Sequence, residues 1–181
     1  MGDVTGKGLQ TGMLVALIVG SIRTTVQQDT DPMRILRLVN DQLCEREHAS
    51  ATCLILRIAP DGVVELANAG HIPPYLNGTE MEGALPLGII AGMEFPVMSF
   101  KLEQGDALVL MSDGIAEAQD AHGRLFGFDR ISEMLRKPIT AAEIATTAQN
   151  FGQEDDILVL RVQRDVEQKV EARTEPQFVA S

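Results

Sequence analysis

Four aspartates stand at the ends of apolar segments in this chain of 181 residues. Asp3 ends a first short run, and Asp113 follows the apolar run 107–111. Asp155 and Asp156 together precede the last apolar run. If a sheet brings these positions to one rim, their carboxylates need a cation, because unpaired buried charge is costly. Oxygen ligands of this kind suit Mg²⁺ and Mn²⁺.

Paired divalent ions at such a rim could hydrolyse a phosphate ester. They lower the pKa of a bridging water and clamp the phosphoryl oxygens, so no nucleophilic side chain is required. The sequence also lacks a cysteine- or serine-based nucleophile motif. Aspartate is equally favoured at strand ends, turns and helix caps, where it forms local hydrogen bonds. Spacing alone therefore leaves metal binding and turn chemistry as open alternatives.

The spacing of apolar residues predicts the elements that must position these aspartates. Helices are expected over 6–28 and over 32–47, the second with Asp31 as its N-cap and Pro32 in its first turn. Further helices are expected over 131–136 and 141–151. Strands are expected over 1–4, 52–58, 63–67, 75–76, 95–102, 107–111 and 156–162. The pair Asp61–Gly62 is a hairpin signal between two of these strands.

The order of these elements favours an α+β fold. Helices come first, then strands, then helices and a closing strand, so alternating βαβ units are absent. We therefore expect antiparallel layers rather than a doubly wound parallel sheet. The domain is predicted to span residues 1–162. The segment 163–181 is polar, lacks a sustained period and is expected to be disordered.

Composition narrows the class of protein. The net charge is −11, with 26 acidic and 15 basic residues, which disfavours binding to nucleic-acid phosphates. Cys44 and Cys53 form neither a disulfide framework nor a zinc motif, so we expect two thiols in a reducing cytosol. No uninterrupted apolar run reaches the roughly 18 residues of a membrane span, and no signal peptide is evident. The prediction is a cytoplasmic protein without membrane or nucleic-acid contact.

Five segments resemble, in order, the motifs of bacterial stage II sporulation protein E-type serine phosphatases, relatives of protein phosphatase 2C. These segments are residues 2–8, 68–74, 86–89, 112–118 and 154–157. The resemblance covers about residues 1–162. It implies an αββα sandwich, in which two mainly antiparallel sheets are flanked by helices. It also implies that N-terminal strands of this sandwich are missing from the chain.

The resemblance implies a site for two Mn²⁺ or Mg²⁺ ions. Asp3 would bridge the ions, and the carbonyl of Val4 would be a ligand to one of them. Asp113 and Asp155 would complete the ligands, with Asp156 as the alternative at the last position. Asp3 and Asp113 would thus be the catalytic residues.

Two further residues in the matching segments leave alternatives open. Lys7 could contact a substrate phosphate, or it could be a solvated lysine. A Walker A loop is excluded because Gly8 follows Lys7 and no first glycine has the required spacing. For His71, a structural role in a turn is favoured over a catalytic one.

The resemblance implies a metal-dependent phosphatase that hydrolyses phosphoserine on a regulatory protein, typically an anti-sigma factor antagonist. It also implies an upstream sensor or receiver domain. The family's upstream acidic motif, which supplies a further metal ligand, is not in this chain, and Leu158 stands where threonine is usual. We therefore expect little or no activity from this polypeptide alone. The alternatives are a truncated, non-catalytic interaction module and a hydrolase of small phosphate esters or nucleotides.

Overall fold

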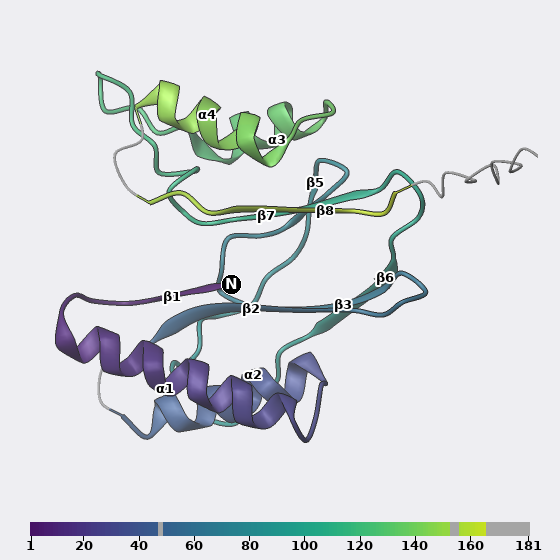
Figure 1. The fold of residues 1–181 in the computed structure, drawn as a ribbon. Helices are drawn as coiled ribbons and strands as arrows, with labels where there is room; N and C mark the ends of the chain where they lie inside the picture. The colour runs from purple at the N-terminus through teal and green to yellow at the C-terminus, as the bar shows by residue number, and fades with distance from the viewer. Residues whose placement is uncertain (47–48, 153–155, 166–181) are drawn as a thin grey trace, which may run out of the picture.

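The chain folds into two stacked antiparallel sheets with helices on both outer faces (Figure 1). The computed structural model describes residues 1–46, 49–152 and 156–165. The first sheet has the strand order β1 (Gly2–Val4), β2 (Ala51–Ile58), β3 (Val63–Ala69) and β6 (Val97–Lys101). The second has the order β5 (Thr79–Glu80), β4 (Tyr75–Leu76), β7 (Ala107–Met111) and β8 (Val159–Gln163).

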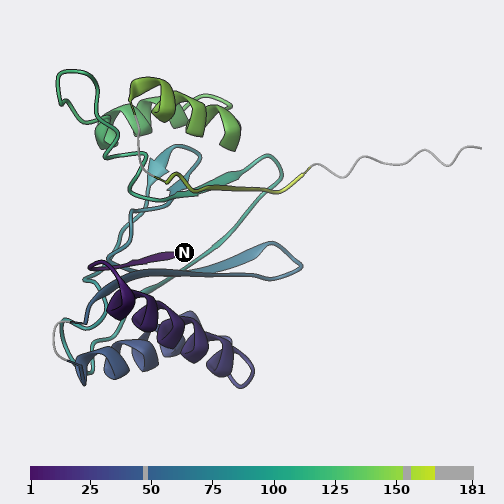
Figure 2. The same cartoon turned by 60° about the vertical axis from the view of Figure 1, so that its left-hand side comes forward.

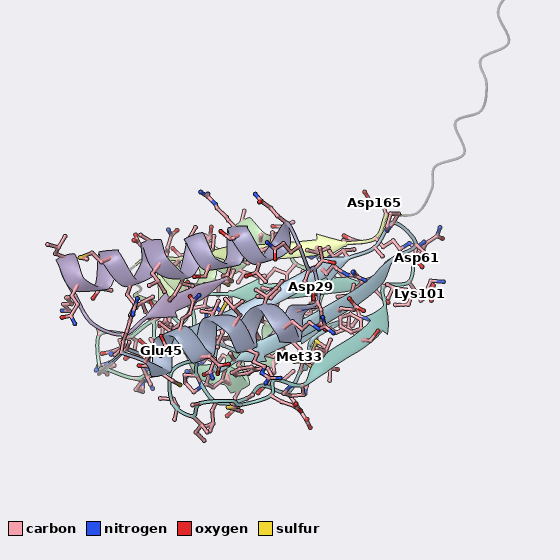
Figure 3. The ribbon with its side chains drawn as sticks, turned by 90° about the horizontal axis from the view of Figure 1, so that it is seen from below. Asp29, Met33, Glu45, Asp61, Lys101 and Asp165 are labelled. Carbon is pink, nitrogen blue, oxygen red and sulfur yellow. The ribbon has the colours of Figure 1, made fainter. Side chains whose placement is uncertain are left out.

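Two pairs of helices cover the sandwich. The pair α1 (Leu9–Val26) and α2 (Pro32–Cys44) covers the first sheet, and the pair α3 (Gly127–Leu135) and α4 (Ala141–Phe151) covers the second. Figure 2 shows the same four layers after rotation. Seen from below, α1 and α2 lie side by side across their sheet (Figure 3). The predicted αββα sandwich is therefore confirmed.

Helix α2 begins as its sequence predicts. The side chain of Asp31 accepts a hydrogen bond from the Met33 backbone N–H at 3.0 Å, and Pro32 occupies the first turn. A side-chain acceptor at this position satisfies one of the backbone donors that a helix start leaves free.

The structure refines the predicted strands. The segment 95–102 contains β6, which pairs with β3 in the first sheet and not with its sequence neighbour β7. The short strand β5 was not predicted, because two exposed residues carry no periodic signal. Strand β8 begins at Val159 rather than at Asp156, so Asp156 lies before the strand. The predicted disordered tail falls largely on residues 166–181, which lie outside the described residues.

Alternation along the strands divides the core into three layers. In β7, Leu108 and Leu110 belong to the cluster between the sheets, whereas Val109 and Met111 belong to the cluster beneath α3 and α4. A strand buried on both faces reads as a continuous apolar run because successive side chains point to opposite faces. The third cluster joins α1 and α2 to the first sheet.

The two cysteines lie in or beside this third cluster. Cys53 is buried and Cys44 is half-buried, and both are free thiols, as predicted. Burial raises the pKa of the Cys53 thiol above its ordinary value.

Helix α1 is the most apolar helix of the described chain. It spans 18 residues with a mean hydropathy of 1.4, so its length and composition alone would suffice to cross a membrane. In the fold, however, Ile18 is buried, and Leu14, Leu17 and Ile22 pack with it against the α2 side of the first sheet. The helix thus has a packed inner face, although Leu9 and Met13 near its start remain exposed.

Candidate metal centre

The sandwich brings three strand ends to one side of the molecule. The end of β1, the end of β7 and the beginning of β8 all lie at the same side in Figure 1. Strands β7 and β8 are antiparallel, with Met111 opposite Val159. The pairing continues beyond them, because the Ser112 N–H donates to the Leu158 carbonyl at 2.9 Å and the Leu158 N–H donates to Ser112 Oγ at 3.0 Å. This ladder carries Asp113 to the side from which β8 starts.

Asp3 lies in the middle of β1, the short edge strand of the first sheet. It pairs with Thr52 on β2, and its side chain is exposed. Met1 and Leu54 form two backbone hydrogen bonds with each other. In this ladder the odd-numbered residues therefore face β2 with their backbone N–H and carbonyl groups. Because antiparallel ladders alternate, the Val4 carbonyl points away from β2 and is free to ligate a cation.

Gly2 lets β1 approach β2 closely. A Cβ at this position would stand 2.5 Å from the Thr52 carbonyl oxygen, so any side chain would force the strands apart. The glycine before Asp3 therefore sets the position of the aspartate relative to the sheet. Gly6 and Gly8, with φ of 114° and 82°, then turn the chain from β1 into α1.

Polar side chains close the inter-sheet layer at this end. Thr52 is two residues from Leu54 on β2, and Asn68 is two residues from Leu66 on β3, so the period of two places both on the face of the inter-sheet cluster. His71 follows Asn68 in the turn after β3. Asn68 and His71 are buried, with 2% and 7% of their surface exposed.

His71 lies within the electrostatic reach of both predicted catalytic carboxylates. Burial lowers the pKa of His71 below its ordinary value, and the positive charge of the amino terminus lowers it further. Asp113, the Met111 backbone and Asp3 act in the opposite direction and raise this pKa. Two aspartates 110 positions apart in the sequence, one from each sheet, thus both act electrostatically on one imidazole and raise its pKa.

The Asp113 loop is a tight turn anchored in the second sheet's core. The Glu117 N–H donates to the Asp113 carbonyl at 2.8 Å, and Ile115 and Ala116 are buried. The side chain of Asp113 itself is exposed. The apolar anchors leave the carboxylate at the surface, where a cation can reach it.

The structure brings together only part of the predicted ligand set. Within residues 1–46, 49–152 and 156–165, no three His, Cys, Asp or Glu side chains gather as a metal site. Asp155 lies outside the described residues, and Asp156 is exposed just ahead of β8. The oxygen donors of Asp3, Val4 and Asp113 fit a hard divalent cation by their chemistry. The complete ligand set stays a prediction.

Lys7 lines a surface hollow beside this rim. The hollow has a volume of about 450 Å³ and is also lined by Thr5 and Arg46. It therefore offers two cationic side chains close to the segment that carries Asp3. Sequence reasoning missed Arg46, because an isolated arginine after a helix belongs to no motif.

The sequence did not indicate the roles of two polar residues of the site, Thr52 and His71. Thr52 carries no motif, and its role is visible only from its place opposite Asp3. His71 does lie in a turn, as favoured, but it is buried there and hydrogen-bonded to Thr52 and Asn68. The signal that could have found Thr52 is the period of two, since a threonine stands where β2 would otherwise place an apolar residue.

The sequence matches the family model of stage II sporulation protein E (SpoIIE) over residues 1–165. This chain belongs to the SpoIIE family. The match covers the segments that carry Asp3, Asp113 and Asp156.

Solved structures share the SpoIIE-type fold at low sequence identity. The SiaA-PP2C domain of Pseudomonas aeruginosa matches with a TM-score of 0.76 and 22% identity, over 91% of this chain and 74% of that one. The RsbU and RsbW domains of a Mycobacterium tuberculosis protein match with a TM-score of 0.69 and 22% identity, over 91% of this chain and 50% of that one. The phosphatase domain of SpoIIE from Bacillus subtilis, with a fragment of its regulatory domain, matches with a TM-score of 0.70 and 20% identity, over 90% of this chain and 52% of that one. This chain thus spans about half the length of two of these structures.

Proposed function

We propose that this chain is the catalytic part of a metal-dependent protein serine phosphatase, and that two Mn²⁺ or Mg²⁺ ions bind at the rim described above. The observation that carries the proposal is that β1, β7 and β8 present Asp3, Asp113 and Asp156 at the same side of the sandwich, from opposite sheets. The membership of the SpoIIE family supports the phosphatase class. In this assignment Asp3 bridges the ions, and Val4, Asp113 and Asp155 or Asp156 supply further oxygens.

The metal requirement is supported by a relative of the same fold. The catalytic domain of the serine threonine protein phosphatase PstP, with a TM-score of 0.63 and 16% identity to this chain, was solved in complex with 2 manganese ions. When bound, such ions would supply an activated water and polarise the phosphoryl group. The residues of this chain would hold the ions and orient the phosphate ester.

We further propose a phosphoserine on a regulatory protein of the anti-sigma factor antagonist type as the substrate. The cations Lys7 and Arg46 beside the rim would attract the phosphate on an otherwise acidic protein. One solved structure of the same fold contains an RsbU domain together with an RsbW domain, which supports a substrate that is a regulatory protein. An upstream sensor or receiver domain and a cytoplasmic location belong to the same proposal.

The direct test is Mn²⁺-dependent hydrolysis of p-nitrophenyl phosphate. We expect the Asp113→Asn variant to lose the Mn²⁺-dependent part of the activity, because an amide is a weaker ligand than a carboxylate. Asp165→Asn is the matched control, since this exposed aspartate follows β8 at the opposite end of the strand and makes the same change of charge (Figure 3). Equal and measurable Mn²⁺-dependent activity of wild type and Asp113→Asn would contradict the ligand assignment.

A non-catalytic interaction module is the second candidate. It is favoured by a hollow of about 540 Å³ between α1 and the edge of the first sheet, where Val15, Val19 and Ile55 form part of an apolar lining. Metal binding distinguishes the two candidates, because little turnover is expected from this polypeptide alone in either case. Absence of Mn²⁺ binding in calorimetric titration, in a chain that unfolds cooperatively, would favour the interaction module.

A further inference from the structure

A chain of hydrogen bonds links the backbone of Asp3 to the ring of His71. The Asp3 N–H donates to Thr52 Oγ1 at 3.1 Å, and Thr52 Oγ1 lies 3.0 Å from His71 Nδ1. The link spans three separate segments: the edge strand β1, the neighbouring strand β2 and the turn after β3. It connects a predicted metal ligand to a residue that no ligand assignment includes.

His71 is itself held rigidly by its own turn. Its backbone N–H donates to Asn68 Oδ1 at 2.9 Å, and Asn68 Nδ2 donates to the His71 carbonyl at 3.0 Å. Both residues are buried, so water does not compete for these bonds. These bonds fix the backbone of His71, and the bond between Nδ1 and Thr52 Oγ1 connects the ring to the residue that bonds Asp3.

The other ring nitrogen is enclosed by the protein. Nε2 of His71 is buried and has no hydrogen-bond partner among the described residues. A buried polar atom without a partner costs free energy, so His71 is held in place by the bonds at Nδ1 and at its backbone.

The Thr52 hydroxyl accepts from the Asp3 N–H, and its own proton is available to donate to His71 Nδ1. With Thr52 as this donor, the neutral imidazole accepts at Nδ1 and carries its proton on the buried Nε2.

We propose that His71 is a positioning residue, which holds the backbone of Asp3 through Thr52. It thereby fixes a predicted metal ligand on the edge strand β1 relative to β2 and the turn after β3. The consequence for metal binding rests on the proposed function, whereas the hydrogen-bond relay does not.

The matched variants Thr52→Val and Thr52→Ser test the relay. Valine has nearly the shape of threonine but no hydroxyl, whereas serine keeps the hydroxyl. We expect the Asp3 amide to exchange its hydrogen about two- to tenfold faster in Thr52→Val, as measured by NMR, and at the wild-type rate in Thr52→Ser. Equal exchange in all three proteins would overturn the relay.

Calorimetric titration with Mn²⁺ tests the consequence. Loss of groups that orient metal ligands typically lowers affinity by about 10- to 100-fold, so we expect this loss in Thr52→Val and His71→Asn but not in Thr52→Ser. Unchanged affinity in Thr52→Val and His71→Asn would overturn the positioning role. If the wild type itself binds no Mn²⁺, the proposed function fails, and amide exchange alone then decides the relay.

The tautomer offers a test on the unmodified protein, independent of how any variant folds. Nitrogen-15 NMR of the histidine ring distinguishes the two neutral forms. We expect the proton of His71 on Nε2. A proton on Nδ1 would overturn the proposed direction of the relay.

Discussion

At the scale of single residues, the site combines exposed carboxylates with a buried imidazole. Asp3 and Asp113 face solvent, where a hydrated divalent ion can approach them. His71 is withdrawn from water, and burial is the largest cause of its lowered pKa. The charged form of His71 is thus disfavoured, so the imidazole acts as a neutral hydrogen-bonding group.

This lowered pKa predicts how stability depends on pH. The unfolded chain binds a proton on His71 at higher pH than the folded chain does, so the free energy of unfolding decreases as the pH falls below about 6.5. His71→Asn lacks this contribution, and its stability should fall less steeply between about pH 7 and pH 5. Urea unfolding of both proteins in EDTA measures the difference. Parallel declines would contradict a buried neutral His71.

At the scale of elements, turns and loops from distant segments fit together to place the strands. Gly70 has a φ of 68°, and a Cβ there would lie 2.6 Å from Pro86. Leu87 then forms two backbone hydrogen bonds with Ala51, the first residue of β2. Two of the segments that resemble family motifs, 68–74 and 86–89, therefore pack on each other beside the site rather than contributing ligands.

Gly70→Ala is expected to be more destabilising than Gly92→Ala. Both glycines have nearly the same φ, 68° and 69°, but an added Cβ at Gly92 meets nothing within 4 Å. Gly92→Ala should cost about 1 kcal/mol from backbone conformation alone, and Gly70→Ala about 2 to 3 kcal/mol, because Pro86 must also move. Chemical denaturation provides both values. Equal losses would show that the contact with Pro86 does not constrain the turn.

At the scale of the whole molecule, the proposed centre lies between two sheets whose strands are far apart in the sequence. Its geometry therefore depends on how the sheets stack through Leu54, Leu66, Leu108 and their neighbours in the inter-sheet layer. A metal ion bound by Asp3 and Asp113 would tie the two sheets together. The high negative charge of the protein adds a general attraction for cations, which a control must separate from specific binding.

Mn²⁺ should accordingly raise the thermal stability of the chain. Saturation at about a hundredfold excess over Kd adds about 2.7 kcal/mol to the free energy of unfolding, which calorimetry detects as a higher Tm. Asp113→Asn should lose most of this increase, whereas Asp165→Asn should keep it. An equal increase in all three proteins would indicate unspecific attraction of cations rather than a site between the sheets.

The sequence by itself determined the local structure and the candidate residues. Apolar periodicity predicts α1, α2 and the β2–β3 hairpin, and Asp31 and Pro32 mark a helix start, because these signals depend only on neighbours along the chain. The resemblance of five short segments to a phosphatase family directed attention to Asp3 and Asp113. It did so without any information on the distance between them.

Only the tertiary structure decided which sheet each strand joins and what surrounds the aspartates. Strand β6 pairs with β3 rather than with β7, because strand pairing is decided by long-range register and not by order in the chain. Thr52, Arg46 and the Nε2 of His71 acquire their roles from neighbours that are tens of residues away. Such contacts produce no periodic pattern in a single sequence, because the two residues become neighbours only when the chain folds.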